Sequence, residues 1–148
     1  MDFIGAIGKR INNLEVCQYA WLNRKYITIT KGRKIKMLKV AILQKRAINA
    51  KIDKNIESII MAMKEASENH ADILLLPECF VTGYDLPMSY EKSIADDDVR
   101  IAKICGNAKK YKIGVVLTAF TKGDKQPQNS AFVINKSGNI LMKYSKVH

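Results

Sequence analysis

Apolar residues recur along the chain at two spacings, one typical of strands and the other typical of helices. Short runs rich in aliphatic residues occupy positions 39–44, 73–76 and 113–120, and such runs are typical of buried strands. Between these runs, residues 56–66 and 101–108 carry apolar side chains every three or four positions, which predicts two helices with one buried face each. The central part of the chain is therefore expected to form strand, helix, strand, helix, strand.

Two more strands are predicted near the end of the sequence. Residues 130–135 and 140–144 are separated by the turn sequence Lys-Ser-Gly-Asn at 136–139, which predicts an antiparallel hairpin. Helices between strands imply right-handed parallel crossovers. The expected fold is α/β, with the element order β-α-β-α-β-β-β and a mixed β-sheet.

Polar residues mark the expected ends of both helices. Asp53 is expected to be the N-cap of the first helix, and Asn69 is expected to close it. The acids Asp96, Asp97 and Asp98 precede the second helix, where carboxylates face the positive end of the helix dipole and cap free N–H groups. A metal site is the alternative for these acids, but they offer one ligand type without a spacing pattern, so no metal is expected.

Composition describes an ordinary globular chain. Its 148 residues suit one domain, and 47% hydrophobic and 26% charged residues are typical of a protein in water. No apolar run approaches the roughly 20 residues that span a bilayer, and the acid at Asp2 argues against a secretory signal. Cys17, Cys79 and Cys105 are far apart and form no C-x-x-C motif, which argues against a disulfide framework or a zinc site. We expect a cytoplasmic protein without a cofactor.

The net charge of +11 makes nucleic acid a partner to consider. Residues 1–36 carry eight basic and two acidic residues, whereas residues 37–148, with seventeen and twelve, are only mildly basic for their length. The lysines of the longer part lie on the expected solvated helix faces, and no aromatic stripe runs between them. Nucleic-acid binding is therefore not the expected function.

The first 36 residues differ from the rest of the chain. They have no clean period of 2 or 3.6, and the convincing pattern begins just after Met37. Two interpretations stay open for residues 1–36. Either Met37 is the natural start and they are an upstream leader read in frame, or they are a genuine basic extension that binds a partner or another subunit.

A carboxylate follows the second predicted strand. Pro77 cannot continue the ladder of hydrogen bonds, so the strand should end there, and Glu78 comes next. A charge at the end of a buried strand is costly unless it is used, and ligands of open α/β sheets bind at that edge. The alternative is that Glu78 is a solvated loop residue.

Four segments together resemble the nitrilase superfamily, the carbon–nitrogen hydrolases. They are the strand at 39–44, the sequence Leu-Leu-Pro-Glu-Cys-Phe-Val-Thr-Gly-Tyr at 75–84, Asn-Ser-Ala at 129–131, and the ending Tyr-x-Lys-x-His at 144–148. The resemblance runs from about Met37 to the last residue. It implies that residues 37–148 are the first half of a four-layer α-β-β-α sandwich, a partial domain truncated before the nucleophile.

The resemblance also implies residue roles. Glu78 would be the general base, and Lys146 would stabilise the charge of the tetrahedral intermediate formed from an amide or nitrile substrate. The family's nucleophilic Cys lies a few dozen residues beyond that Lys, so it is not expected in this chain. Phe80 and Tyr84 are candidates to line the substrate pocket, with packing in the core as the alternative. Cys79 would point away from the pocket if the backbone at Glu78 is extended.

Three functions follow from these observations. The first is an amidase-type hydrolase that works through a thioester, present here as an N-terminal portion that is inactive alone and self-associates through an uncovered sheet face. The second is a non-catalytic half-domain that pairs with another chain through that face. The third, least favoured, is a basic nucleic-acid-binding module.

Overall fold

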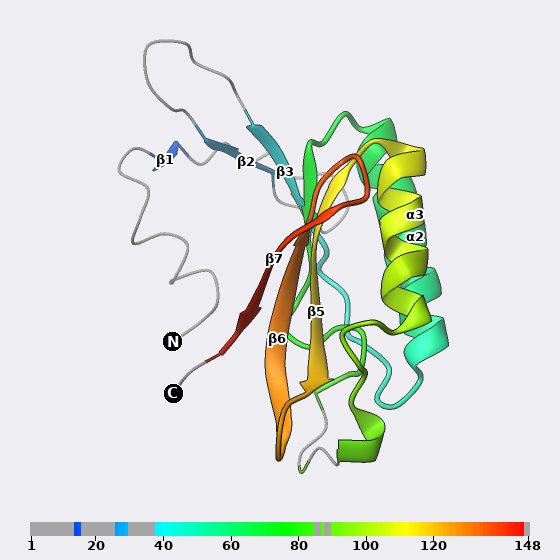
Figure 1. Ribbon diagram of the computed structural model, residues 1–148. Helices are drawn as coiled ribbons and strands as arrows, with labels where there is room; N and C mark the ends of the chain where they lie inside the picture. Colours follow the sequence, from blue (N-terminus) through cyan, green and yellow to red (C-terminus); the bar gives the residue numbers. More distant parts are fainter. Residues whose placement is uncertain (1–13, 16–25, 30–37, 85–86, 88–89, 147–148) are drawn as a thin grey trace.

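The computed structural model of the protein describes residues 14–15, 26–29, 38–84, 87 and 90–146. A mixed β-sheet runs through these residues, with two helices packed side by side against it (Figure 1). The elements in chain order are β1 (Leu14–Glu15), β2 (Tyr26–Ile29), β3 (Leu38–Ile42), α2 (Ile52–Glu68), β4 (Ile73–Leu75), the 3₁₀ turn η1 (Tyr90–Lys92), α3 (Val99–Tyr111), β5 (Gly114–Lys122), β6 (Pro127–Ile134) and β7 (Ile140–Ser145).

The strands lie in the sheet in their order along the chain, from β1 to β7. The pairs β3–β4 and β4–β5 are parallel, each joined by a helical crossover, whereas β5–β6 and β6–β7 are antiparallel. The predicted order β-α-β-α-β-β-β and the mixed sheet are confirmed for residues 38–146. Strands β1 and β2 were not predicted. They are two and four residues long and extend the sheet by antiparallel backbone pairing, β2 with β3 and β1 with β2.

Two of the three helix ends predicted from the sequence agree with the structure. The Asp98 carboxylate accepts a hydrogen bond from the backbone N–H of Arg100 at 2.8 Å and caps α3, and Lys109 and Lys110 occupy its last turn. Asn69 closes α2. The prediction that Asp53 caps α2 is wrong, because the helix already begins at Ile52 and Asp53 lies in its first turn, where its charge still suits the helix dipole.

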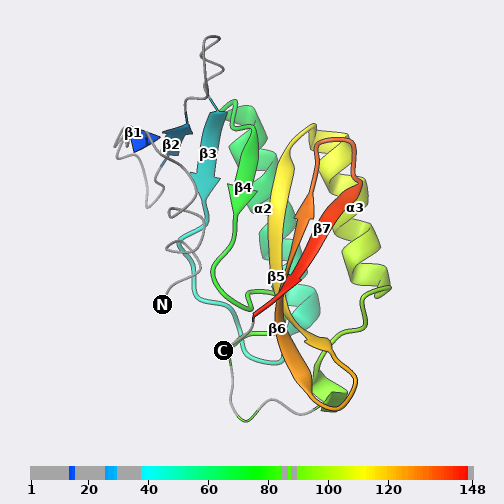
Figure 2. The same ribbon diagram turned by 60° about the vertical axis from the view of Figure 1, so that its left-hand side comes forward.

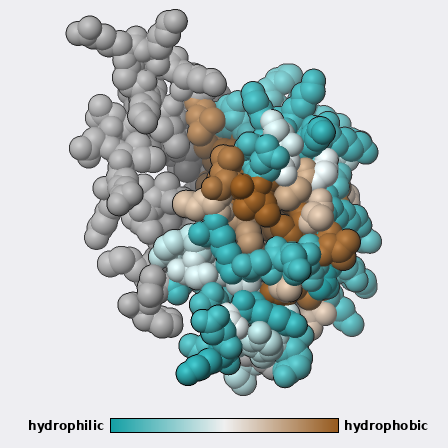
Figure 3. Space-filling view, in the orientation of Figure 1, coloured by the Kyte–Doolittle hydropathy of each residue, from teal (hydrophilic) through white to brown (hydrophobic). Residues whose placement is uncertain are grey.

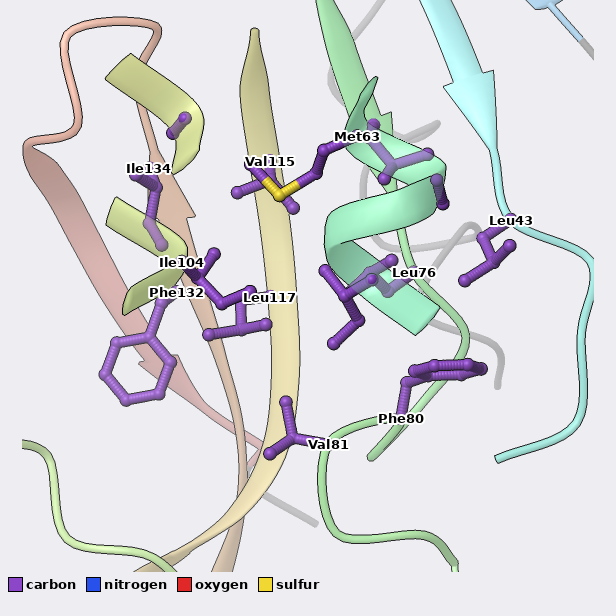
Figure 4. Packing of buried hydrophobic residues seen from close by; sticks show 14 of the residues in the cluster. Leu43, Met63, Leu76, Phe80, Val81, Ile104, Val115, Leu117, Phe132 and Ile134 are labelled. Carbon is purple, nitrogen blue, oxygen red and sulfur yellow. The ribbon is translucent and has the colours of Figure 1, made fainter. Parts of the chain in front are cut away.

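The core lies between the two helices and one face of the sheet (Figure 2). Strand β5 runs through its centre, and residues 114–121 are all buried. Met63 of α2 reaches toward Val115 of β5, whereas Ile104 of α3 lies near Leu117, with Phe132 of β6 beside it (Figure 4). Burial of such side chains is the main force that holds the helices on the sheet.

The last strand is much less covered than β5. Leu141 is 64% exposed, Met142 55% and Tyr144 42%, although apolar side chains of this size are usually buried. Figure 3 shows a band of apolar surface across the molecule in this view. Neither α2 nor α3, the two long helices among the described residues, has the length and apolar content of a bilayer-spanning helix.

Candidate active site

The turn that follows β4 is fastened to the neighbouring strand β5. Thr118 holds it at three points. Its hydroxyl accepts the backbone N–H of Phe80 at 3.1 Å and donates to the carbonyl of Pro77, while its own carbonyl accepts the N–H of Val81 at 3.0 Å. Thr118 is 3% exposed, so these bonds are shielded from water. They fix the segment that contains Glu78.

Thr82 and Gly83 complete the turn. The Thr82 hydroxyl accepts the backbone N–H of Phe120 at 3.1 Å, which joins the far end of the turn to β5. Gly83 has a φ of +80° and lies against Asn49, whose Oδ1 would be 2.6 Å from a Cβ at this position. Only glycine combines that backbone conformation with so close an approach.

The hairpin of β6 and β7 carries the second predicted site residue to the same place. Ser130 pairs with Ser145, and their hydroxyl oxygens are 3.0 Å apart. The next backbone bond runs from the N–H of Lys146 to the carbonyl of Asn129 at 2.8 Å. This register determines where the Lys146 side chain begins.

Glu78 and Lys146 meet at the end of the sheet. The Lys146 Nζ donates to Oε1 of Glu78 at 3.3 Å, and the Nδ2 of Asn129 donates to the same oxygen at 2.5 Å. The two charged side chains are 44% and 42% exposed, so water screens their attraction. The hydrogen bond and charge of Glu78 raise the pKa of Lys146 above its ordinary 10.5. The two residues that the sequence singled out, 68 positions apart, therefore face each other.

Cys79, next to Glu78, lies in a different environment. Its side chain is fully buried, and burial first and the Glu78 charge second raise the pKa of its thiol from 9.0 to about 12. The backbone here is not extended, contrary to the condition set from the sequence. Cys79 has a φ of +50° and belongs to the turn, so it is the turn, and not strand alternation, that directs the thiol into the protein.

The two aromatic pocket candidates differ in their surroundings. Phe80 is 1% exposed and belongs to the hydrophobic core, the alternative that the sequence left open. Tyr84 is 50% exposed, and its ring centroid lies 5.7 Å from that of Phe120. The Tyr84 phenol is also near enough to Lys146 to influence its charge. Tyr84 is thus the aromatic side chain beside the Glu78–Lys146 pair.

The acidic run before α3 has structural partners. Asp98 caps the helix, and Asp96 accepts two hydrogen bonds from the Lys143 Nζ, at 2.6 and 2.7 Å. No group of three or more His, Cys, Asp or Glu side chains that could hold a metal occurs in the part of the chain that the structure describes. Cys17 and His148 lie outside that part.

Asn129 and Thr118 touch the site, although neither was assigned a role from the sequence. Asn129 stands out there only as part of a family segment, and Thr118 only as one residue of a buried strand. A polar residue inside a run of aliphatic residues, such as Thr118 in Val-Val-Leu-Thr-Ala-Phe, was the available signal, because a buried hydroxyl needs partners.

Comparison with known proteins identifies the relatives of this chain. The carbon-nitrogen hydrolase family matches residues 39–148. The "Hydrolase in agr operon" of Staphylococcus aureus is 31% identical over 112 residues, which are 75% of this chain and 43% of that protein. The 2-oxoglutaramate amidase of Bacillus subtilis is 34% identical over 87 residues, 57% of this chain and 33% of that protein.

Solved structures give the same result. An amidase from Nesterenkonia sp. superimposes with a TM-score of 0.62 and 26% identity, over 75% of this chain and 43% of that one. A mutant of the amidase from Nesterenkonia sp. AN1 in complex with butyramide superimposes with a TM-score of 0.64 and 27% identity over the same shares. The chain spans less than half the length of these relatives. By its sequence match and by its fold, it belongs to the carbon-nitrogen hydrolase family.

Proposed function

We propose that the chain is part of an amidase-type hydrolase that cleaves non-peptide carbon–nitrogen bonds in small amides or nitriles. The observation that carries the proposal is the contact between Glu78 and Lys146, 3.3 Å apart at the end of the sheet. A base and a fixed cation are the two groups that a thiol needs beside it to attack an amide. The amidases among the relatives, including one bound to butyramide, support this substrate class.

In the proposed reaction each of the two residues has one task. Glu78 takes the proton of a cysteine thiol, and the thiolate attacks the carbon of the amide. Lys146 stabilises the negative charge that develops on the tetrahedral intermediate. Glu78 gives its proton to the leaving nitrogen, which departs as ammonia or an amine, and water then hydrolyses the thioester to release the acid and restore the thiol. Lys146 is an ammonium at neutral pH, and the hydrogen bond that it donates to Glu78 raises its pKa further above 10.5. Side chains, the substrate and water supply every group in this reaction, so it needs no cofactor.

We infer that the nucleophile of this reaction is a cysteine other than Cys79 and Cys105, the two cysteines that the structure describes. A thiol with a pKa of about 12, as burial gives Cys79, is ionised in only about one molecule in 10⁵ at pH 7. Cys105 is half-buried on α3, and burial raises its pKa as well. In the related Nesterenkonia amidase, acetamide from fluoroacetamide is attached to an active-site cysteine. We therefore expect no hydrolysis by the 148-residue protein alone.

The proposal includes the setting of the protein. We place it in the cytoplasm, where buried unpaired thiols such as Cys79 stay reduced. Residues 1–36, which precede the family match, are proposed to be either an upstream leader or a basic extension. Mass spectrometry of the natively expressed N-terminus distinguishes them, because a mature protein that starts at Met1 contradicts the leader.

A non-catalytic half-domain is the second candidate function. The exposed apolar side chains of β7 favour it, since Leu141 and Met142 offer a surface that another chain could cover. The coding sequence downstream of residue 148 separates the two candidates. A continuation with a cysteine and a second series of strands supports the hydrolase, and its absence supports the half-domain.

The catalytic proposal is tested by ammonia release from a panel of amides that includes butyramide. The 148-residue protein and the product that includes the downstream coding sequence are assayed side by side, and activity is expected only in the second. In that product, Glu78→Gln and Lys146→Ala should each lower kcat by about 10²- to 10³-fold. Lys143→Ala is the matched control, because Lys143 lies on β7, three residues before Lys146, but pairs with Asp96. Ammonia release by the 148-residue protein, or full activity of Lys146→Ala, would contradict the proposal.

A further inference from the structure

The two oxygens of the Glu78 carboxylate are not equivalent. Oε1 accepts both the Asn129 amide, at 2.5 Å, and the Lys146 ammonium, at 3.3 Å. Within the described residues, no hydrogen bond reaches Oε2. Since both donors converge on one oxygen, the second is left for another group.

Asn129 is a rigid support for this arrangement. It lies on β6, paired with Phe120 of β5 on one side, and its carbonyl accepts the N–H of Lys146 on the other. One residue thus holds Glu78 through its side chain and Lys146 through its backbone. The Asn129 amide nitrogen can only donate in this contact, so it selects a carboxylate oxygen that accepts.

We infer that Asn129 is a positioning residue that reserves Oε1 for itself and Lys146, so that Oε2 is the oxygen that takes the proton of the nucleophile. This inference rests on the proposed function of Glu78. In the step, the S–H bond of the cysteine breaks, its electron pair stays on sulfur, and an O–H bond forms at Oε2. A carboxylic acid protonated at Oε2 still accepts at Oε1, so both contacts of Oε1 survive the transfer. A proton on Oε1 would instead meet two donors.

The test follows the side-chain amide protons of Asn129 by NMR in the 148-residue protein while Glu78 is titrated. They should shift in one step that disappears in Glu78→Gln, and their exchange with solvent should stay slow on the acid side of the step. Asn107, whose amide donates to the Lys103 carbonyl at 2.8 Å on α3, is the internal control and should show no step. If protonation of Glu78 speeds Asn129 exchange by roughly fivefold or more relative to Asn107, the proton is on Oε1 and the inference is wrong.

A pair of variants separates positioning from simple stability. Asn129→Leu keeps the shape of the side chain without its donor, so Glu78 should turn away and the Lys146 pKa should fall toward 10.5. Asn107→Leu, the matched control, should leave the Lys146 pKa unchanged even where it lowers the unfolding temperature. An unchanged Lys146 pKa in Asn129→Leu would overturn the positioning role. Neither measurement needs catalysis, so a failed assay for hydrolysis leaves both results interpretable.

Discussion

Lys146 carries its charge beside Glu78, and this neighbour extends to higher pH the range over which the site keeps an ammonium. Because the ion pair is partly exposed, its effect is on ionisation more than on stability. The pKa of Lys146 is raised mainly by the hydrogen bond to Glu78 and next by its charge. The lysine of the site therefore keeps its charge to a higher pH than an isolated lysine would.

Replacing Glu78 by Gln should lower the Lys146 pKa toward 10.5, because the anionic acceptor is lost. Since the folded pKa is the higher one, the contribution of the pair to stability is complete below 10.5 and is lost as the pH rises through the raised value. The variant should flatten this alkaline limb of the stability curve. NMR titration of the lysine side chains and urea unfolding from pH 9 upward measure both effects. Asp96→Asn, which removes the partner of Lys143 instead, should change neither for Lys146.

Cys79 should resist alkylation in the folded protein. Its pKa of about 12 and its full burial leave little thiolate and no access for a reagent, whereas the half-buried Cys105 should react sooner. Peptide mass spectrometry after iodoacetamide treatment at pH 8, with and without urea, compares the two thiols. Because the folded pKa is raised from 9.0, ionisation of Cys79 should also destabilise the fold as the pH rises from 9 toward 12. Rapid labelling of Cys79 without urea would contradict this account.

Some site residues were visible in the sequence and others were not. Glu78 stands out because a carboxylate after a buried strand is unusual, and Lys146 stands out only through its family segment. The contact of Asn129 with Glu78 depends on the register of three strands, which the sequence does not state. Cys79 was rightly separated from Glu78 but for the wrong reason, since the left-handed turn residue carried no signal of its own.

At the scale of elements, the turn at Pro77–Gly83 fixes Glu78 in place at the end of β4. Gly83→Ala should destabilise the protein by about 2–4 kcal/mol, because the positive φ is strained for alanine and its Cβ would collide with Asn49. Gly106→Ala is the matched control. It lies within α3, where an added methyl group would meet no neighbouring element within 4 Å, so alanine should stabilise by about 0.5–1 kcal/mol. Urea unfolding of both variants measures the difference, and a neutral Gly83→Ala would show that the turn tolerates a side chain.

The element boundaries show what local sequence can and cannot decide. Asp98 was predicted as a cap because it is followed directly by the helical pattern, and its carboxylate makes that bond. Asp53 is an equally good capping residue, but the helix after β3 already begins at Ile52, so Asp53 lies inside it. Strand β6 begins at Pro127, earlier than the predicted start at residue 130. Its first residues are polar and show no apolar pattern, but they pair with the long strand β5.

At the scale of the whole molecule, one side of the protein is completed by helices and β7 is left largely uncovered. The self-association that the sequence leads us to expect should use this strand. Met142→Lys together with Leu141→Ser should shift the protein toward monomer in sedimentation velocity, because both side chains are more than half exposed. Met61→Lys is the control, since Met61 is 72% exposed on α2, on the other layer. Equal effects of the two changes would argue against β7 as the contact surface.

The overall arrangement could be predicted for most of the chain but not for its beginning. Alternating strands and helices restrict the topology strongly, which is why the order from β3 to β7 was correct. Strands β1 and β2 are too short to produce a period and join the sheet through backbone bonds. Almost any residue can form such backbone bonds, so no sequence pattern predicts these two strands.

Because Lys146 lies 68 positions after Glu78, the ribosome synthesises it well after the glutamate. A ribosome that adds about 5–20 residues per second leaves the glutamate without its lysine for roughly 3 to 14 seconds, longer while the lysine is still inside the exit tunnel. During translation the Glu78 carboxylate lies in a turn whose hydrogen bonds to β5 cannot form until β5 has emerged from the ribosome. The ion pair between Glu78 and Lys146 therefore forms late in biogenesis, only after β7 has paired with the sheet.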